Sequence, residues 1–353
     1  MNKLFSLILA STLTVSTATQ ASDKLLLKTS TAFPSSLPVL GTALTDFSTT
    51  VGNISGGKIK VKVYDPGKLV SPTEILDAVS SGKVNSGFAG AGYWQGKMPA
   101  APLFSSVPFG PEAGEYLAWM YHGNGMKLYQ KMYDDAGYNV KVTICGVLPP
   151  ETSGWFAKPI EKPEDLKGLN MRIYGLGADV MSKLGVGTLK LPAAEIFGAL
   201  EKGAIDAAEF SMPVIDQKLG FSKIVKYNYF PGWHQQTTLL ELLINKKTWN
   251  EMNQEQQSQI ETACKATVTN SIAEGEALQF DAMKNAKASG VNIVYWNDTM
   301  LKTFKTTWNT VAEEQSKADP FFNEVWQDMS TFREGYKLWK DNAYLPFSTA
   351  NKL

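Results

Sequence analysis

The sequence predicts an α/β protein of two lobes, joined by two antiparallel hinge strands and followed by a long C-terminal helix. Strand-like and helix-like patterns alternate along the chain, which is typical of the α/β class. One helix–glycine–strand pattern occurs twice, once in each half. Two long strand-like segments, residues 140–148 and 237–246, stand where the chain could cross between the halves.

The first 21 residues predict a secretory signal peptide. A short basic start, MNK, precedes the apolar run LFSLILASTLTV, and the small residues of ATQA end at Ala21. No later run reaches the roughly 18 apolar residues that a membrane-spanning helix needs. We therefore expect an exported, soluble mature chain in the periplasm.

The first half of the mature chain alternates strands and helices. A strand is predicted at residues 24–31 and a helix at 39–51. Apolar and polar residues alternate over 58–69, which indicates a half-buried strand. A helix at 73–82 and a short apolar strand at 84–92 follow.

The repeated pattern lies at residues 73–88 and 194–210. Each copy has a Glu-Ile pair, a glycine eight residues after the glutamate, and Asn or Asp three residues after the glycine. In each, a helix ends at a glycine and leads into a buried strand. Chance is one interpretation, because this order is common in α/β proteins. The other, more specific interpretation is that the chain has two lobes of similar construction. The predicted boundaries are 22–148 and 237–286 for lobe I, and 149–236 and 287–297 for lobe II.

The C-terminal part is predicted to be mostly helical. An amphipathic helix is expected at 250–288, a strand at 291–296, and a long helical segment over 298–353, interrupted at ADPFF. That last segment carries many large aromatic residues: Phe304, Trp308, Phe321, Phe322, Trp326, Phe332 and Trp339. So much aromatic surface needs burial, either on its own lobe or in a homodimer that exchanges the helix.

Charge and motifs exclude several function classes. The chain has 34 basic and 34 acidic residues, and loss of Lys3 with the signal peptide gives 33 − 34 = −1. Because the basic residues are spread out, nucleic-acid binding is not expected. The HExxH, GxSxG and GxxxxGK motifs are absent, so we expect no enzyme. The cysteines, Cys145 and Cys264, either pair or remain two buried thiols.

Arginine is rare in this chain and marks a candidate site. Only Arg172 and Arg333 occur among the 34 basic residues, and Arg172 lies in a short apolar strand. A guanidinium can hold a carboxylate through two parallel hydrogen bonds, which lysine cannot do. The sequence therefore predicts an anionic carboxylate ligand at Arg172.

Three other polar residues stand beside aromatic residues near predicted strand ends: Glu151, Glu209 and Gln235. Strand ends converge on the cleft of a two-lobed α/β protein. A lone glutamate there is usually solvated, and Arg172 could simply pair with Glu209. Burying the whole set is costly without a ligand. Arg172 and the two glutamates sum to −1, and a carboxylate ligand makes −2, which predicts a bound Na⁺ or Ca²⁺ with oxygen ligands.

Three segments carry a family resemblance: LKGLNMRIYGLGADVMSKLG, ALEKGAIDAAEF and YFPGWHQQTTLLELLINKKTWNEM. They resemble the solute-binding subunits of TRAP (tripartite ATP-independent periplasmic) transporters, and the resemblance covers the whole mature chain. It implies a periplasmic binding protein-like fold and delivery of a ligand to the membrane subunits of the transporter. Members are often dimers with a swapped C-terminal helix.

The chain most resembles the branch that binds 2-oxo acids such as pyruvate, or lactate, with a metal ion. This implies that Arg172 binds the ligand carboxylate and that Glu209 binds the metal. Phe210, where Trp is more common, would contribute its backbone carbonyl. Glu151 would be a ligand where Gln is more common, and Gln235 where Glu is more common. The last two departures preserve the total charge.

The candidate ligand contacts are Arg172, Glu151, Tyr93, Phe210 and Trp233. Three alternatives remain open at this point. The ligand could be a sugar acid, a dicarboxylate or an aromatic acid, with Arg172 in the same role. The protein could present its ligand to a sensory receptor. Glu151 and Glu209 could also form an acid/base pair of an enzyme, although the nearby arginine argues against it.

Overall fold

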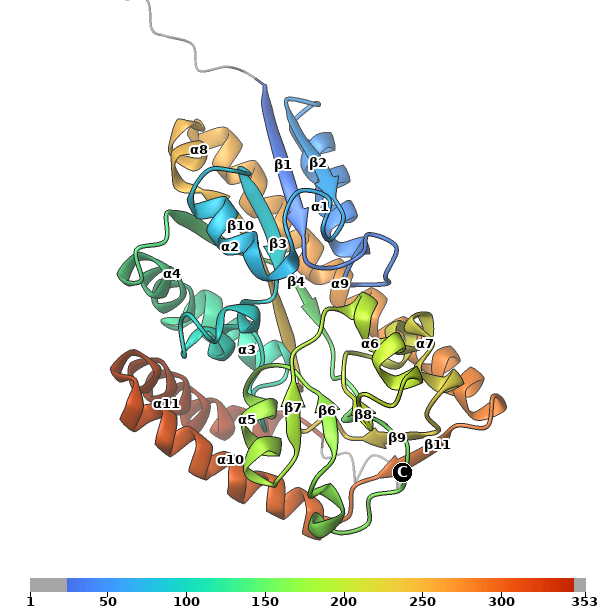
Figure 1. Ribbon diagram of the computed structural model, residues 1–353. Coiled ribbons are helices and arrows are strands. Elements are labelled where there is room, and N and C mark those ends of the chain that lie inside the picture. Colours follow the sequence, from blue (N-terminus) through green and yellow to red (C-terminus); the bar gives the residue numbers. More distant parts are fainter. Residues whose placement is uncertain (1–23, 346–353) are drawn as a thin grey trace, which may run out of the picture.

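The computed structural model describes residues 24–345 of the chain. The predicted signal peptide, residues 1–21, lies outside the described residues, as do residues 346–353. Two β-sheets with helices packed around them form two lobes, one in the upper and one in the lower part of Figure 1. The predicted two-lobed α/β fold is confirmed.

The first sheet has five strands in the order β2-β1-β3-β10-β4. β1 is parallel to β2 and β3, whereas β10 is antiparallel to β3 and β4. The strands are β1 (Leu25–Thr31), β2 (Ile59–Tyr64), β3 (Ser86–Ala89), β4 (Val140–Leu148) and β10 (Thr238–Asn245). The strands predicted in these regions are confirmed, with the longest pair, β4 and β10, at the predicted positions.

The helices of the upper lobe are α1 (Thr42–Ile54), α2 (Ile75–Ser80), α3 (Ala113–His122), α4 (Gly125–Asp135) and α8 (Lys246–Glu251). The predicted helix at 39–51 begins three residues later, at Thr42. Val39 has a φ of 58° and is followed by a bond from the Leu40 amide to the Pro38 carbonyl at 2.6 Å. This tight turn replaces the first helical turn.

The second sheet has six short strands in the order β11-β9-β5-β8-β6-β7. They are β5 (Gly154–Phe156), β6 (Asn170–Arg172), β7 (Gly187–Leu189), β8 (Ala207–Ala208), β9 (Tyr227–Phe230) and β11 (Asn292–Tyr295). The accompanying helices are α5 (Gly175–Lys183), α6 (Ala193–Glu201) and α7 (Pro213–Leu219). Five short 3₁₀ helices lie between these elements in the described chain. In the first lobe they are η1 (Pro72–Glu74), η2 (Ala91–Trp94) and η3 (Ala101–Phe104), and in the second lobe η4 (Pro163–Leu166) and η5 (Phe221–Lys223).

The repeated helix–glycine–strand pattern is present in both sheets. α2 leads into β3 through Gly82, and α6 leads into β8 through Gly203. Both glycines have positive φ angles, 78° and 66°, where a side chain would be strained. The repeat in the sequence is thus a repeat in the structure.

Two of the chain crossings between the sheets lie at one end of the β4–β10 pair, and a later one runs through residues 254–288 to β11. Leu148, the last residue of β4, is opposite Thr238, the first residue of β10. The chain passes to the second sheet after Leu148 and has come back from it at Thr238. The predicted antiparallel pair of crossing strands is therefore confirmed.

A disulfide fastens the longest helix to this pair. Cys145 in β4 and Cys264 in α9 (Gln254–Ala288) are bonded, with an S–S distance of 2.08 Å. α9 packs against β4 and α1 and continues to α7 of the second lobe, as the diagonal orange helix of Figure 1 shows. Of the two alternatives for the cysteines, the structure has the disulfide.

The C-terminal segment forms a hairpin of two helices, α10 (Asp298–Ala318) and α11 (Pro320–Ala343). The predicted break is present, and the Asp319 carboxylate accepts a hydrogen bond from the Phe322 amide at 2.7 Å. α10 packs against α5 of the second lobe, and α11 packs against α3 and α4 of the first (Figure 1). The hairpin therefore spans both lobes.

The aromatic residues of the hairpin pack mainly on the chain's own lobes, three of them fully buried and three partly buried. Phe304, Trp308 and Phe322 are buried, and Trp326 meets Trp308 edge to face at 5.4 Å. Of the two alternatives, the structure shows these rings packed on the chain's own lobes. Trp339 is the exception, with 61% of its surface exposed.

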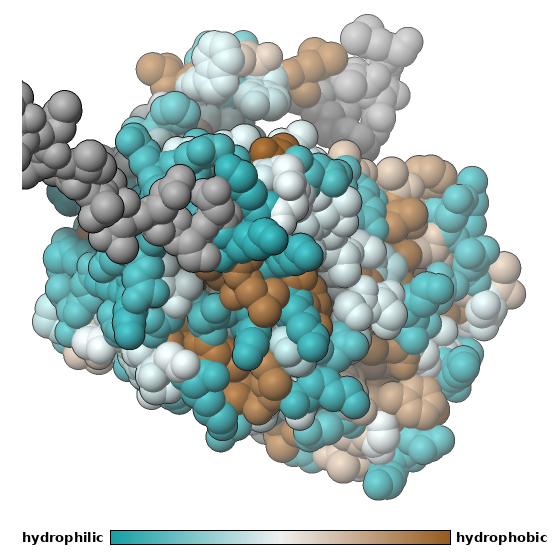
Figure 2. Space-filling model, turned by 90° about the horizontal axis from the view of Figure 1, so that it is seen from above, coloured by the Kyte–Doolittle hydropathy of each residue, from teal (hydrophilic) through white to brown (hydrophobic). Residues whose placement is uncertain are grey.

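Hydrophilic residues cover most of the face seen in Figure 2. Figure 2 shows one face on which hydrophobic residues gather in smaller patches between hydrophilic ones. Among the described helices, none combines the length and apolar character that a bilayer crossing requires.

Candidate ligand and metal site

A small cavity lies between the two sheets, beside the chain crossings. Its volume is about 30 Å³. Both lobes contribute to its wall, which consists of Phe33, Leu40, Gly90, Tyr93, Leu148, Glu151, Arg172, Tyr174, Phe210, Ser211, Gln235, Thr238 and Leu240. Most polar residues of the wall come from the second lobe and the crossings, whereas the first lobe contributes mainly apolar residues together with Tyr93.

Parallel pairing brings Arg172 and Glu209 together. Arg172 ends β6 and is opposite Ala208 of the neighbouring strand β8, so Glu209 follows directly beside it. The Glu209 amide donates to the Arg172 carbonyl at 2.9 Å. Two residues 37 positions apart in sequence thus share one strand edge, as expected where parallel strands end.

Two loops place the other polar residues. The Glu151 amide donates to the Gln235 carbonyl at 3.1 Å, which joins the loop after β4 to the loop before β10. A Cβ on Gly232 would lie 2.2 Å from the Glu151 carbonyl oxygen, so only glycine allows this approach. The Thr238 hydroxyl donates to Glu151 Oε1 at 3.1 Å and accepts from Gln235 Nε2 at 2.8 Å.

Arg172 forms a buried ion pair and leaves one nitrogen for a ligand. Its Nη1 donates to the Glu209 carbonyl and, at 3.1 Å, to Glu209 Oε2, while Nε donates to the Leu191 carbonyl at 3.2 Å. Its guanidinium lies 4.9 Å from the centre of the Phe210 ring. Among the described residues, no hydrogen bond uses Nη2. Arg172 therefore cannot give a ligand carboxylate two parallel hydrogen bonds from Nη1 and Nη2, because Nη1 is bonded to Glu209 and only Nη2 is available.

The two glutamates have opposite pKa shifts. Burial, with the negative charge of Glu209, raises the pKa of Glu151 well above its usual value. Burial also acts to raise the pKa of Glu209, but the neighbouring His234 and the Arg172 charge outweigh it, so that pKa is lowered. In the ligand-free protein, Glu209 is therefore the carboxylate that stays charged, and Glu151 is the one that holds a proton more readily.

Several buried polar atoms at the site have no hydrogen-bond partner among the described residues. They are Glu151 Oε2, Glu209 Oε1, Ser211 Oγ, His234 Nδ1 and Nε2, and Gln235 Oε1. One ligand atom from each of Glu151, Glu209 and His234 lies within 4.8 Å of the others. Buried polar atoms are nearly always paired, so this set fits a bound cation, with carboxylate and amide oxygens of the kind that Na⁺ and Ca²⁺ prefer.

The chain shows one family match over most of its length. Residues 30–318 match the profile of the bacterial extracellular solute-binding protein, family 7. The chain belongs to this family. The family and its relatives described below are transport solute-binding proteins, and the names of those relatives place them in the periplasm.

Known relatives of this solute-binding protein are similar over most of their length. The monocarboxylate 2-oxoacid-binding periplasmic protein of Nostoc sp. is 36% identical over 289 residues, which are 82% of this chain and 79% of that protein. The 2,3-diketo-L-gulonate-binding periplasmic protein of Escherichia coli is 25% identical over 248 residues, 67% of this chain and 71% of that protein.

Solved structures confirm the TRAP resemblance. A TRAP solute-binding protein of Bordetella bronchiseptica, a mixed-occupancy dimer with copurified calcium and picolinate, has a TM-score of 0.88 at 30% identity and covers 91% of this chain and 95% of that one. One from Colwellia psychrerythraea, with calcium and pyruvate, has a TM-score of 0.86 at 30% identity, with coverages of 91% and 97%. One from Pseudoalteromonas atlantica, with sodium and pyruvate, has a TM-score of 0.85 at 29% identity and covers 91% of this chain and 97% of that one.

In this solute-binding protein, the structure gathers most of the predicted site residues and places one elsewhere. Arg172, Glu151, Tyr93, Phe210 and Gln235 line the cavity, and the buried Glu209 adjoins it. Trp233 is not part of the cavity wall. Its ring stacks on Phe304 of α10 at 4.5 Å and on Phe109 at 5.8 Å, so it fastens the hairpin to the site loop instead.

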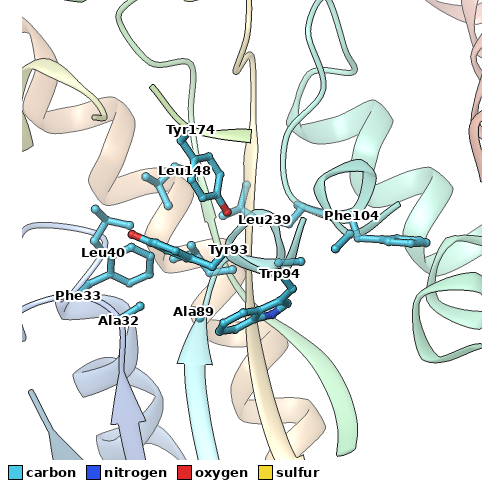
Figure 3. Close-up of a cluster of buried hydrophobic side chains, with 14 of the residues drawn as sticks. Ala32, Phe33, Leu40, Ala89, Tyr93, Trp94, Phe104, Leu148, Tyr174 and Leu239 are labelled. Atoms are coloured by element: carbon cyan, nitrogen blue, oxygen red, sulfur yellow. The ribbon is translucent and has the colours of Figure 1, made fainter. Parts of the chain in front are cut away.

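Two tyrosines close the cavity between the lobes. Figure 3 shows Tyr174 reaching from the second lobe over Tyr93 of the first, and their ring centres are 5.2 Å apart. The Tyr174 hydroxyl lies 3.3 Å from Ser105 Oγ across the lobes. No hydrogen bond joins the Tyr93 hydroxyl to another described residue, and in Figure 3 it points toward Leu40.

His234, Tyr174 and Thr238 belong to the site but were not predicted from the sequence. Tyr174 had a usable signal, because it follows Arg172 by two residues and side chains two apart share a face of an extended chain. His234 directly precedes Gln235 in the sequence, and a zinc-motif search missed it because its partners are distant carboxylates. Nothing in the sequence near Thr238 distinguishes it from other strand threonines.

Proposed function

We propose that this protein captures a small 2-oxo or 2-hydroxy monocarboxylate, similar to pyruvate or lactate, together with a metal ion. It then delivers the acid to the membrane permease of a TRAP transporter. The observation that supports this most is the buried cavity in which Arg172 lies beside two glutamates with oxygen atoms that have no partner. A carboxylate bound to Arg172 Nη2 and to a cation would satisfy these atoms.

The cavity favours a short ligand with one charged end. Its wall includes the apolar residues Phe33, Leu40, Leu148 and Leu240, and the hydroxyl of Tyr93 is the polar group that points toward Leu40 (Figure 3). One hydroxyl of a ligand could pair with Tyr93, but further hydroxyls of a sugar acid, or the second charge of a dicarboxylate, would be buried against the apolar residues without hydrogen bonds, which costs roughly 1–3 kcal/mol for each group. A monocarboxylate with a small apolar tail avoids that cost.

A cation is part of the proposed site. Glu151, Glu209 and Gln235 would supply side-chain oxygens, and Phe210 its backbone carbonyl. With a monocarboxylate bound, Arg172 and the two glutamates leave a net charge of −2, which Ca²⁺ neutralises and Na⁺ halves. Relatives of similar fold hold calcium or sodium with pyruvate, so either ion is compatible with this proposal.

The proposed role is binding and delivery, without catalysis. Glu209 is held by Arg172 and cannot readily exchange a proton, because its pKa is lowered while that of Glu151 is raised. Retention of an unchanged ligand after gel filtration would support this role, whereas turnover would contradict it. Export through the segment 1–21 and residence in the periplasm belong to the same proposal.

The proposed lobes follow the sheets. Residues 22–148 and 237–286 form lobe I and carry the strands of the first sheet. Residues 149–236 and 287–297 form lobe II and carry those of the second. Opening at the β4–β10 ends would admit the ligand, and the α10–α11 hairpin within the proposed segment 298–353 would brace both lobes.

Ligand identity is tested directly by mass spectrometry of the protein isolated from the periplasm, with elemental analysis for the bound metal. We expect a monocarboxylate of a few carbon atoms and one calcium or sodium ion. Melting temperature should then rise with pyruvate or lactate, more than with glucuronate or succinate. A larger shift with a sugar acid or a dicarboxylate would replace the proposed ligand class. Binding that occurs only in complex with a receptor would favour the sensory alternative.

Arg172→Lys should keep the fold and weaken monocarboxylate binding by roughly ten- to a hundredfold. A charge-assisted hydrogen bond contributes about 1.5–3 kcal/mol, and lysine cannot hold Glu209 and the ligand together. Calorimetry measures the change. Arg333→Lys is the matched control, because Arg333 contacts Glu115 and the Phe109 carbonyl away from the cavity. Equal affinities for the Arg172→Lys and Arg333→Lys proteins would remove Arg172 from the ligand site.

We also propose a homodimer that forms through the end of α11. Leu338, Trp339 and Leu345 are 73%, 61% and 63% exposed, so large apolar side chains near the end of α11 are uncovered in the single chain. Light scattering of the mature protein at micromolar concentration should give the dimer mass, and Leu338→Asp combined with Trp339→Asp should give the monomer mass. A monomeric wild-type protein would disprove the dimer and leave the hairpin as a brace within one chain.

A further inference from the structure

Glu241 is a buried carboxylate of the first lobe that takes no part in the proposed ligand and metal site. It lies in the middle of β10. Its Oε1 accepts a hydrogen bond from Trp94 Nε1 at 2.6 Å. Its Oε2 accepts from the hydroxyl of Tyr133 at 2.6 Å and from that of Tyr129, both in α4. Burying a carboxylate is costly without partners, and these three neutral donors stabilise its charge.

The hydrogen bond from Trp94 fastens the 3₁₀ helix η2 to the first sheet. Trp94 is the last residue of η2, which follows β3 after Gly90, and Glu241 is opposite Ala89 at the end of β3. The indole is fully buried, and its N–H can only donate. Because Glu241 supplies the acceptor, the orientation of the Trp94 ring, and with it the position of η2, depends on this carboxylate.

The residues on either side of Trp94 both contact the second lobe. Tyr93 lines the cavity, and its ring centre lies 5.2 Å from that of Tyr174 and 6.2 Å from that of Trp94. Figure 3 shows the Tyr93 ring between the other two. Gln95 Nε2 donates to Asp179 Oδ2 of α5 at 2.9 Å. A shift of Trp94 would therefore move a ring of the cavity wall and a hydrogen bond between the lobes together.

We propose that Glu241 is a positioning residue for ligand selection, which holds Trp94 so that Tyr93 keeps the cavity too short for 2-oxo acids with long tails. The inference rests on the proposed monocarboxylate function and extends it to ligand length. Glu241 does not touch the ligand and acts through Trp94. A longer acid must displace Tyr93, and a closely packed wall resists displacement as long as η2 is fastened to the sheet.

Two substitutions of similar size test the acceptor at position 241. Glu241→Met keeps the side-chain length but offers Trp94 only a weakly accepting sulfur. Glu241→Gln keeps one oxygen for the indole N–H, and its amide group can donate to the two tyrosine hydroxyls. Calorimetry in Ca²⁺ gives the affinities for pyruvate and for 2-oxohexanoate. We expect their ratio, pyruvate over 2-oxohexanoate, to fall by about tenfold in Glu241→Met and to stay within about threefold of wild type in Glu241→Gln.

A variant on the other side of the carboxylate controls for lost stability. Tyr133→Phe removes one hydrogen bond to Glu241 from α4 and leaves the one from Trp94 in place. It should lower the melting temperature without changing the affinity ratio. If Glu241→Met does not fold, Trp94→Phe takes its place, because it keeps an aromatic ring and removes the N–H. The ratio should fall in this variant as well.

The outcomes separate this inference from the proposed function. An affinity ratio that falls equally in Tyr133→Phe and Glu241→Met would reduce Glu241 to a purely structural group. A wild-type ratio in Glu241→Met, or in Trp94→Phe where that variant is used, would also overturn the positioning role. Both results leave the monocarboxylate proposal intact. If the wild type binds neither acid, the proposed function itself is wrong, and this inference is wrong with it.

Discussion

Reduction of the Cys145–Cys264 disulfide should lower the free energy of unfolding by about 4–5 kcal/mol. The bond closes a loop with a sequence separation of 119 residues, and long loops restrict the unfolded chain most. It also joins β4, which leads into one chain crossing, to α9, which contacts both lobes. Urea unfolding of the mature protein with and without a thiol reductant measures the difference.

A variant separates the covalent effect from packing. Both cysteines are fully buried, so the double variant Cys145→Ala, Cys264→Ala loses the bond and a small amount of core volume together. Reduced wild-type protein loses only the bond. We expect the reduced protein to be destabilised nearly as much as the variant. If reductant leaves the urea midpoint of fully reduced wild type unchanged, the native packing alone fixes α9 on β4, and the disulfide has no stabilising role.

Periodicity was enough to predict the long elements of the fold. The alternating and apolar segments at 140–148 and 237–246 identified β4 and β10, because each has eight or nine residues of strong strand character. The second sheet was harder to predict. Its strands have two to four residues, which is too short for a period of two to be visible. Of its strands, the sequence predicted β11 at 291–296, β8 at the end of the repeat 194–210, and β6 around Arg172.

The site was predictable where chemistry is unusual and unpredictable where packing decides. An arginine in a lysine-rich chain, with glutamates after two other segments, pointed to Arg172, Glu151 and Glu209. The sequence could not show whether Trp233 lines the cavity or packs against α10, because a tryptophan side chain suits either apolar environment. Nor could it show how an aromatic tail is buried, since a partner chain and the chain's own lobes offer the same kind of surface.

Removal of all small cations should weaken monocarboxylate binding by roughly a hundred- to several-thousandfold. The Arg172 and Glu209 side chains are 2% and 0% exposed, so water cannot screen the charges around them. A buried charge left without its partner costs about 3–5 kcal/mol, which corresponds to this loss of affinity. Titration calorimetry in chelator, with choline as the only added cation, measures it against the same protein in Ca²⁺ or Na⁺.

The pH dependence of the monocarboxylate affinity that remains without cations should report the protonation of Glu151. Burial and the nearby Glu209 charge raise the pKa of Glu151, so without a cation this carboxyl is neutral below the raised pKa and charged above it. Because the neutral form repels an anionic ligand less, residual binding should weaken as pH rises through that pKa. With Ca²⁺ present, the metal keeps Glu151 ionised and this dependence should vanish.

Glu151→Gln provides the matched comparison, because it keeps a side-chain oxygen for the metal and removes one negative charge. The net charge with ligand bound then falls from −2 to −1, so the cation should contribute less and the loss of affinity in choline should shrink by at least about tenfold. The residual pH dependence should also disappear, since the titrating group is gone. Equal affinity with and without cations in the wild type would mean that Glu151 and Glu209 hold no metal. A cation requirement as large in Glu151→Gln as in the wild type would assign the metal to Glu209 without help from the charge of Glu151.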